Sequence, residues 1–433
     1  MAFDDAAIDA WELKASRRIL LNLKTLLNEA PMLKLLDGQI RDADAYHRAL
    51  LAASDGRWRE ARTDLEIKGL SAADFGTWFR ETSATGFAPE TMFTAHPEHY
   101  VMPDGGMVET IGGHPLRFGV GTAEAADLPR PVADFADPAY PITLAAVMLL
   151  QDGTTYAYAV HQMRPTADGV DFALRIVYPA AAPDLMIAEH QEHLAIEFRN
   201  ANRHAGSTLG ITPAARATIG TDSFDDGGID GLELKAARRA LANLKSLLRG
   251  DDMLSLIGAQ IDAGDAFHQA LIAESHGAFR DSQTTLHVEG VSVEDFFGWM
   301  ARELQASHDD SELTHLKAHP EHYVLPVHPE GLSIVETIGG HLTRFYSSPQ
   351  DPLPGHITAY HDDAYPTKVL NGGVNLYDGT PVLWSAHQAR NTATGSEWNL
   401  RIIFAAAAPD SMIAEHQEHL AVEFRNYIAG ART

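Results

Sequence analysis

Histidines and glutamates gather on the segment MIAEHQEHLAIEFRN, which begins at Met186 and is predicted to be a helix. His193 and Glu197 are four residues apart, so on a helix their side chains share one face and lie a turn apart. Such a pair could present two ligands to one metal ion. Glu189 with His193 has the same spacing, His190 lies near the same face, and a solvated polar face would have a similar composition. The helix alone therefore leaves the ligand pair open.

Two more histidines, His96 and His99, flank a proline in the segment AHPEHYV. Proline favours a turn or a strand edge here, because its φ is fixed and it has no N–H to donate. The pair could point into a cavity or hold a turn together by hydrogen bonds. Glu109 follows in VETIGGH on a predicted strand, where it could face either side, and Gly112 and Gly113 permit a tight bend.

His161 ends a second predicted strand, TTYAYAVH. A neutral imidazole there could serve as an acid, a base or a metal ligand near neutral pH, and a histidine satisfied in the core fits the pattern as well. Its counterpart His387 follows PVLWSAH, so the aromatic neighbours of the two histidines differ. The strand residues Tyr156, Tyr158 and Trp384 offer planar surfaces to a ring.

The candidate residues occur twice in the chain, which raises the joint probability that they form a site. They are His96, His99, Glu109, His114, His161, His193 and Glu197, which return as His319, His322, Glu336, His341, His387, His419 and Glu423. The chain has no cysteine, so a metal would be held by nitrogen and oxygen ligands. Such ligands suit Zn, Mn or Fe(II), of which zinc is the most common in hydrolysis.

The elements that must position these residues form a tandem duplication. FDDAAIDAWELKASRR, from Phe3, returns as FDDGGIDGLELKAARR from Phe224, and the match continues to EFRN in both copies. We therefore predict two α+β repeats, residues 1–204 and 224–433, each binding a metal, with a linker at 205–223. Two matching surfaces in one chain favour an intramolecular pseudo-dimer, and a homo-oligomer is compatible with them.

Each repeat is expected to run from helices through a sheet to a closing helix. The first repeat opens with a helix whose apolar residues recur every 3.6 positions, and a second helix is predicted from about Met32 to Arg59. TDLEIKG predicts a strand, and Ser71 a helix N-cap. VETIGG, the segment from Thr155 to His161 and the alternating segment from Val170 to Tyr178 predict an antiparallel sheet.

Length and charge limit the function classes. A chain of 433 residues suits two domains. Lys and Arg number 33 against 59 Asp and Glu, so the net charge of 33 − 59 = −26 repels nucleic acids and anionic membranes alike. The acidic start MAFDDAAIDA is unlike a signal peptide, and no segment has the length and apolarity of a membrane span, so a cytoplasmic location is expected.

The order of these motifs resembles the 2,4-diacetylphloroglucinol hydrolase and phloretin hydrolase family. SAADFGTWF, AHPEHYV, VETIGGHPLRF, a strand ending near His161, RIVY and a His-x-x-x-Glu helix follow one another over about Thr63–Asn200. Related segments follow in the same order over about Thr284–Asn426. The family consists of zinc enzymes that hydrolyse a carbon–carbon bond beside an aromatic ketone. The resemblance leaves the helical start of each repeat unexplained.

The resemblance implies a fold, a ligand set and a reaction. The fold is a Bet v1-like helix-grip, an antiparallel sheet around a long C-terminal helix. The implied zinc ligands are His99, Glu109, His193 and Glu197 in one repeat and His322, Glu336, His419 and Glu423 in the other, with His161 and His387 acting on the substrate. That substrate would be an acylated polyphenol or a β-diketone, because a polyhydroxylated ring accepts the leaving electron pair as a delocalised enolate.

Two other classes of function fit the same residues. A helix-grip cavity can bind an apolar small molecule without a metal or a reaction. The same ligands could also serve a lyase or an oxygenase. The full ligand set in both repeats favours a metal enzyme over an empty cavity.

Overall fold

The computed structural model describes residues 4–103, 105–303, 305, 308–350 and 352–432. It divides into two compact units. The first unit is Leu20–Ala240, and the second unit combines Met1–Ile19 with Leu241–Thr433. Both boundaries fall inside helices, within α1 (Asp5–Leu27) and α7 (Asp226–Leu247).

The two units follow a similar but not identical order of helices and strands. The first unit contains α2 (Glu29–Ser54), β1 (Trp58–Lys68), α3 (Ala72–Thr85), α4 (Pro89–Ala95), β2 (His99–Val101), β3 (Gly106–Ile111), β4 (His114–Ala123), the 3-10 helix η1 (Ala125–Asp127), α5 (Arg130–Ala133), β5 (Ile142–Leu149), β6 (Thr155–Pro165), β7 (Gly169–Pro179), α6 (Asp184–Thr208), β8 (Ala214–Ile219) and β9 (Asp222–Asp225). The second unit contains α8 (Gly250–Ser275), β10 (Phe279–Glu289), α9 (Val293–Glu303), α10 (His308–Ala318), β11 (His322–Val324), β12 (Val327–His328), β13 (Gly331–Ile338), β14 (His341–Pro349), α11 (Gly355–Thr358), β15 (Thr367–Leu376), β16 (Pro381–Asn391), β17 (Gly395–Ala405) and α12 (Asp410–Gly430).

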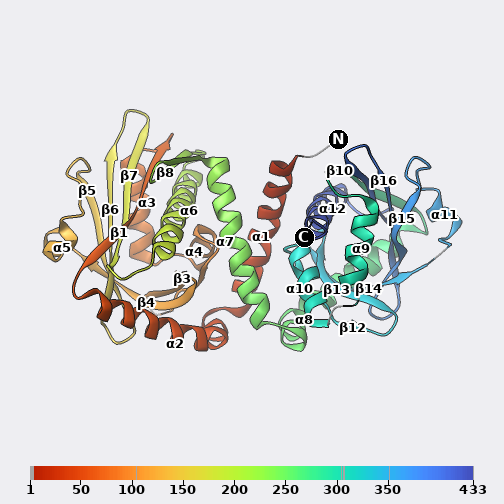
Figure 1. Cartoon of the computed structure of the whole chain (residues 1–433), viewed down its shortest axis with the longest axis horizontal. Helices are drawn as coiled ribbons and strands as arrows, with labels where there is room; N and C mark the ends of the chain where they lie inside the picture. Colours follow the sequence, from red (N-terminus) through yellow and green to blue (C-terminus); the bar gives the residue numbers. More distant parts are fainter. Residues whose placement is uncertain (1–3, 104, 304, 306–307, 351, 433) are drawn as a thin grey trace. The chain divides into compact units, whose positions relative to one another are not determined.

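Each unit is built on one antiparallel sheet. Its order in the first unit is β2-β3-β4-β5-β6-β7-β1-β8-β9, and in the second unit β10-β17-β16-β15-β14-β13-β11, with β12 on β13. Helix α6 contacts β1, β7 and also β3, although β3 and β1 are five positions apart in the sheet. Strands are about 4.8 Å apart, so a flat sheet would separate β1 and β3 by roughly 24 Å, more than the width of a helix. The sheet therefore curves around α6 (Figure 1).

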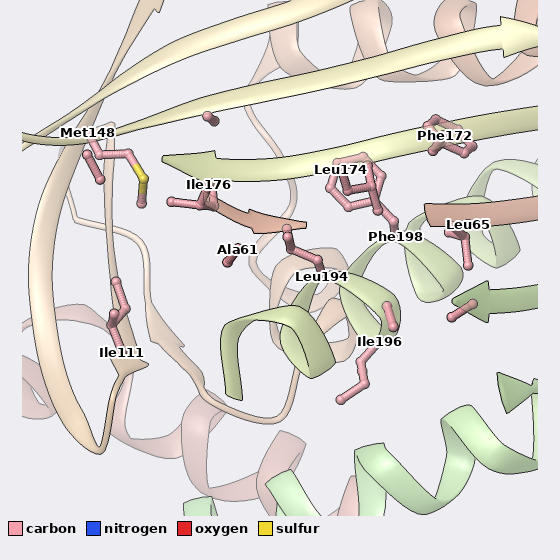
Figure 2. Close-up of a cluster of buried hydrophobic side chains, with 14 of the residues drawn as sticks. Ala61, Leu65, Ile111, Met148, Phe172, Leu174, Ile176, Leu194, Ile196 and Phe198 are labelled. Carbon is pink, nitrogen blue, oxygen red and sulfur yellow. The ribbon is translucent and has the colours of Figure 1, made fainter. Parts of the chain in front are cut away.

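The core of the first unit lies between this sheet and the apolar side of α6. Leu194, Ile196 and Phe198 of α6 are buried together with Phe172 and Leu174 of β7 (Figure 2). The closing helix therefore holds apolar residues against the sheet, while His193 and Glu197 project from other positions of the same helix.

The α+β class and the antiparallel sheets agree with the sequence analysis. The predicted N-cap at Ser71 is confirmed, because its hydroxyl accepts a hydrogen bond from the Asp74 N–H at 3.1 Å. The second helix was predicted to continue to Arg59, which is wrong. It ends at Ser54, since Asp55 and Gly56 adopt left-handed conformations, and the chain then enters β1.

The predicted domain boundaries and linker need correction. Residues 205–208 still belong to α6, and β8 pairs with β1 from Lys68↔Ala214 to Asp64↔Thr218. Ala215 and Ala217 are buried on β1, so this segment is part of the first sheet rather than a linker. The repeat boundaries also differ from the compact units, because the first half of each opening helix groups with the unit built from the other repeat. No helix in the described part of the chain combines the length and apolarity that crossing a membrane requires.

Candidate metal centre

Two neighbouring strands position the first two predicted ligands. His99 on β2 lies directly opposite Glu109 on β3. Side chains at directly opposite positions of an antiparallel pair project from the same face. This pairing answers the question that the sequence left open, since Glu109 faces the same side as His99. His322 on β11 and Glu336 on β13 are paired in the same way.

Helix α6 brings the other two predicted ligands of the first unit to this face. His193 Nε2 lies 3.1 Å from His99 Nε2 and 3.8 Å from Glu109 Oε2. Glu197 adds a second carboxylate, with Oε2 3.8 Å from His193 Nε2 and Oε1 4.0 Å from His99 Nε2. His99 Nε2 is 3.3 Å from Glu109 Oε2. Two nitrogen and two oxygen ligands that the sequence places up to 98 residues apart therefore converge.

The backbone fixes which nitrogen of His99 faces this cluster. His99 Nδ1 lies 3.0 Å from the Met92 carbonyl oxygen, which can only accept, so Nδ1 carries the proton. The lone pair of the neutral ring is then on Nε2, which faces His193 Nε2 and a carboxylate oxygen. Lone pairs brought together in a buried place are stabilised by a proton or a metal ion between them. A backbone bond to the far nitrogen is also the usual support of a histidine that binds metal.

The second unit repeats this geometry. His322 Nε2 lies 3.1 Å from Glu336 Oε2, 3.3 Å from His419 Nε2 and 3.7 Å from Glu423 Oε1. His322 Nδ1 donates to the His315 carbonyl at 2.7 Å. The same tautomer and the same four-residue cluster therefore occur in both units.

The ligand spacing fits a four-coordinate ion. With metal–ligand bonds of about 2.0–2.1 Å, the edge of a tetrahedron is roughly 3.4 Å. The distances from His99 Nε2 and from His322 Nε2 to the other ligand atoms of their clusters are 3.1–4.0 Å. Among the described residues, three groups of buried side chains are close enough to hold a metal ion: His96 with His99 and His193, Glu109 with His190 and His193, and His319 with His322 and His419.

The electrostatics of the first unit also fit a cation. Burial lowers the pKa of His193 well below its usual value, and His96 and His190 lower it further. Burial opposes protonation of His99 too, but Glu109 and Glu197 outweigh it and raise the pKa of His99. Burial raises the pKa of Glu197 to about 7, with His99 opposing and Glu109 reinforcing the shift. A divalent cation would stabilise the charged carboxylates and the neutral imidazoles together.

Comparison with known proteins leaves the family open. No protein-family description matches this chain, and no curated protein does. The solved structures that are similar to it include the di-domain ARO/CYC BexL from the BE-7585A biosynthetic pathway and the di-domain ARO/CYC StfQ from the steffimycin biosynthetic pathway. Both are 10% identical, with TM-scores of 0.21 and 0.22. The matches cover 86% of this chain and 97% of BexL, and 85% of this chain and 96% of StfQ. Similarity this low carries no argument about the chemistry of this chain.

His96, an alternative ligand in the sequence analysis, stacks on His193 with ring centroids 3.7 Å apart. Its Nδ1 accepts a hydrogen bond from the Glu98 N–H at 3.1 Å, so the neutral ring carries its proton on Nε2. That N–H has no hydrogen-bond partner among the described residues. His96 is thus set up as a donor rather than a ligand. His190 also stacks on His193, with ring centroids 4.9 Å apart.

The predicted catalytic histidines lie on β6 and β16. His161 Nδ1 accepts from the Arg175 N–H at 3.3 Å, and His387 Nδ1 accepts from the Arg401 N–H at 2.9 Å. Burial, with the Arg175 charge, lowers the pKa of His161 to about 4, and burial with the His416 charge lowers that of His387 to about 3. Both rings are therefore neutral at neutral pH and carry Nε2–H. Such rings can act as hydrogen-bond donors, and the catalytic role of the two histidines stays a prediction.

The recurring histidines His114 and His341 lie apart from the two clusters. His114 stacks on Tyr46 of α2, with ring centroids 4.2 Å apart, and His341 stacks on Phe267 of α8 at 3.7 Å. Their recurrence is explained by packing between a helix and β4 or β14.

A small cavity adjoins the second cluster. Its volume is about 10 Å³, and its lining includes His319, His416 and His419. A cavity of this size holds about one water molecule. Space for a water therefore lies beside a candidate ligand.

Sequence reasoning missed the residues that hold the ligand segments in place. Lys24 of α1 is completely buried, and its Nζ donates to the Pro97 carbonyl at 2.7 Å. Lys245 of α7 donates to the Pro320 carbonyl, also at 2.7 Å. One sequence signal could have pointed to these lysines: charged residues recur at matching positions of the two opening helices, and the 3.6-residue spacing of the apolar residues does not explain them.

Proposed function

We propose that this chain is a metal-dependent hydrolase with one metal ion in each unit, which cleaves the carbon–carbon bond beside a ketone in an acylated polyphenol or a β-diketone. The observation that carries the proposal is the convergence of two histidines and two glutamates in both units, at His99 and at His322. The order of motifs that resembles the phloroglucinol hydrolase family, and the helix-grip arrangement that it implies, supply the reaction class. Zinc is the metal we favour, with Mn or Fe as alternatives.

The ligands would be His99, Glu109, His193 and Glu197 in the first unit and His322, Glu336, His419 and Glu423 in the second. Lewis-acid chemistry would come from the bound ion, by polarisation of the acyl carbonyl and activation of water near neutral pH. Hydrolysis adds the water oxygen to the acyl carbon, and the bond from that carbon to the ring breaks. The ring carbon takes up a proton, so the products are a carboxylic acid and the deacylated phenol.

The neutral histidines would hydrogen-bond the substrate. His161 and His387 carry Nε2–H, because a backbone N–H occupies Nδ1. Such a donor can stabilise negative charge that develops on an oxygen of the substrate, which typically contributes 10²–10³-fold in rate. His96 offers a second donor beside His193.

Release of acid from an acylphloroglucinol by the purified, zinc-loaded chain tests this function. We expect acid and deacylated ring in equal amounts. His161→Ala with His387→Ala should lower turnover by about 10²–10³-fold while both metal ions stay bound. His161→Gln with His387→Gln places an amide N–H near the position of Nε2 and should retain part of the rate.

Two results would contradict this assignment. Loss of metal from the His161→Ala and His387→Ala variant would make these histidines ligands. If the zinc-loaded wild type released no acid from any acylphloroglucinol or β-diketone tested, a lyase, an oxygenase or a non-catalytic binding protein would replace the hydrolase.

A further inference from the structure

The opening helix of each repeat carries the same charged residues at the same positions. Asp9, Glu12, Lys14 and Arg18 in α1 recur, 221 positions later, as Asp230, Glu233, Lys235 and Arg239 in α7. The compact units group each set with the ligands of the other repeat. Residues 226–240 belong with the His99 cluster, and residues 4–19 belong with the His322 cluster.

Arg239 holds the residue that directly precedes the ligand His99. Its guanidinium donates to both carboxylate oxygens of Glu98, at 3.1 and 2.7 Å. The Glu98 side chain is only 4% exposed and Arg239 is 33% exposed, so this two-point ion pair is partly buried, with its carboxylate nearly removed from solvent. In the second unit Arg18 donates to both oxygens of Glu321 at 3.1 and 2.6 Å, and Glu321 precedes His322.

Glu233 links the same helix to the other ligand-bearing element. It accepts from Arg199 at 2.6 Å and from Asn200 at 3.2 Å, both of which lie on α6 just after Glu197. Asn200 also donates to the Ala95 carbonyl at 3.1 Å, immediately before the segment that carries His96 and His99. One buried carboxylate of the second repeat therefore joins both sources of ligands in the first unit.

Glu12 has the matching place in the second unit. It accepts from Arg425 and, at 3.4 Å, from Asn426 of α12, and Asn426 donates to the Ala318 carbonyl at 3.0 Å. The lysines near the ends of the two helices, Lys24 and Lys245, follow the opposite rule. Lys24 binds the ligand segment of its own repeat through Pro97, as Lys245 does through Pro320.

We propose that the two repeats exchange the first halves of their opening helices, so that each metal site is positioned by residues of the other repeat. Arg239 and Glu233 act on the His99 site, and Arg18 and Glu12 act on the His322 site. They are positioning residues, since they touch neighbours of the ligands and not the reacting atoms. The inference rests on the proposed metal sites, and it explains why the helical start recurs in each repeat.

The test measures cobalt or zinc affinity in full-length chains that keep a single site. His322→Ala with His419→Ala leaves the first site, and His99→Ala with His193→Ala leaves the second. In the first background, Arg239→Gln should weaken metal binding by about 10- to 100-fold, as loss of an outer support does, while Arg18→Gln should leave it unchanged. In the second background the two substitutions should exchange their effects.

Further variants separate positioning from loss of folding. Arg41→Gln removes an exposed arginine of the first unit that pairs with Asp37, and it should leave affinity unchanged. Arg239→Lys keeps the charge without the two-point contact and should have an intermediate affinity. Glu98→Gln should add little to Arg239→Gln, because both remove the same interaction. If Arg239→Gln does not fold, Arg239→Lys and Glu98→Gln must still weaken the first site alone.

The outcomes distinguish this inference from the proposed function. A wild-type chain that binds neither zinc nor cobalt overturns both. If the wild-type chain binds two ions, the metal sites stand and only the exchange between repeats is tested. The exchange is overturned if Arg239→Gln weakens the second site, or if neither arginine substitution affects either site.

Discussion

At the scale of single residues, the backbone decides what each histidine can do. Two imidazoles in the sequence look alike, but His99 donates from Nδ1 to a carbonyl and His161 accepts at Nδ1 from an N–H. In the neutral state the first ring turns a lone pair toward the cluster, and the second carries a proton on Nε2. One backbone contact to Nδ1 therefore makes His99 a candidate ligand, and another makes His161 a hydrogen-bond donor.

Buried histidines away from the metal centre predict how stability depends on pH. His268 is 3% exposed, and burial with the charge of His341 lowers its pKa to about 4, against 6.5 for the ordinary ring. Between pH 6.5 and 4 the unfolded chain binds more protons at this position than the folded chain does. The stabilisation is thus fully present above pH 6.5 and is lost as the pH falls toward 4.

We expect His268→Phe to reduce the loss of unfolding free energy between pH 7 and pH 5 by about 2 kcal/mol. His47→Phe should act similarly in the first unit, where burial lowers the pKa of His47 to about 4. Urea unfolding at the two pH values measures the effect. The control is His356→Phe, which removes an exposed histidine of the second unit. An unchanged pH difference in His268→Phe would refute this account of acid sensitivity.

At the scale of elements, the hairpin between β3 and β4 places Glu109 beside the closing helix. Gly112 and Gly113 both have positive φ, +58° and +79°, which fits a tight two-residue turn. A Cβ on Gly112 would lie 2.9 Å from Met186 Cγ and 3.1 Å from Met186 Cβ, whereas a Cβ on Gly113 would have no atom within 4 Å. The first glycine is needed for conformation and close packing, and the second for conformation alone.

Gly113→Ala should therefore destabilise the first unit by about 1–2 kcal/mol through its left-handed backbone. Gly112→Ala should cost roughly 1–3 kcal/mol more, because it also crowds Met186 at the start of α6. Unfolding free energies of the two variants provide the comparison. Equal decreases in unfolding free energy for the two variants would mean that Met186 and α6 shift to accommodate the added Cβ without destabilising the unit.

The sequence predicted individual helices, strands and candidate ligands better than it predicted how the strands pair and which way their side chains point. The strand with Glu109, the N-cap at Ser71 and the closing helix follow from local patterns. The direction of Glu109 does not, because it depends on the pairing with His99 across a turn. Strand β8 was taken for a linker, since its buried residues are the small Ala215 and Ala217, which give no strong apolar alternation.

At the scale of the whole molecule, the two units and the two repeats are different divisions of the chain. Arg18 and Glu321 are 303 residues apart in sequence and form a partly buried ion pair in the second unit. Nothing local marks this pairing, because a charged residue on a helix is usually solvent-exposed. The sequence shows that the charged residues of α1 recur in α7. Only the structure shows which residues they bind.

The chain carries a net charge of −26, and each candidate metal centre adds two closely placed carboxylates to a buried setting. Bound divalent cations would relieve this local repulsion, and their binding free energy would add to the stability of each unit. Both units are thus expected to depend on metal, each on its own site.

Elemental analysis of the purified full-length chain tests whether each unit holds a metal ion. We predict one divalent ion per unit in the wild type. His193→Ala should remove one ion, and His193→Ala with His419→Ala should remove both. His114→Gln with His341→Gln changes recurring histidines outside the clusters and should retain both ions. Full metal content in the His193→Ala and His419→Ala variant would contradict the account and place the ions elsewhere.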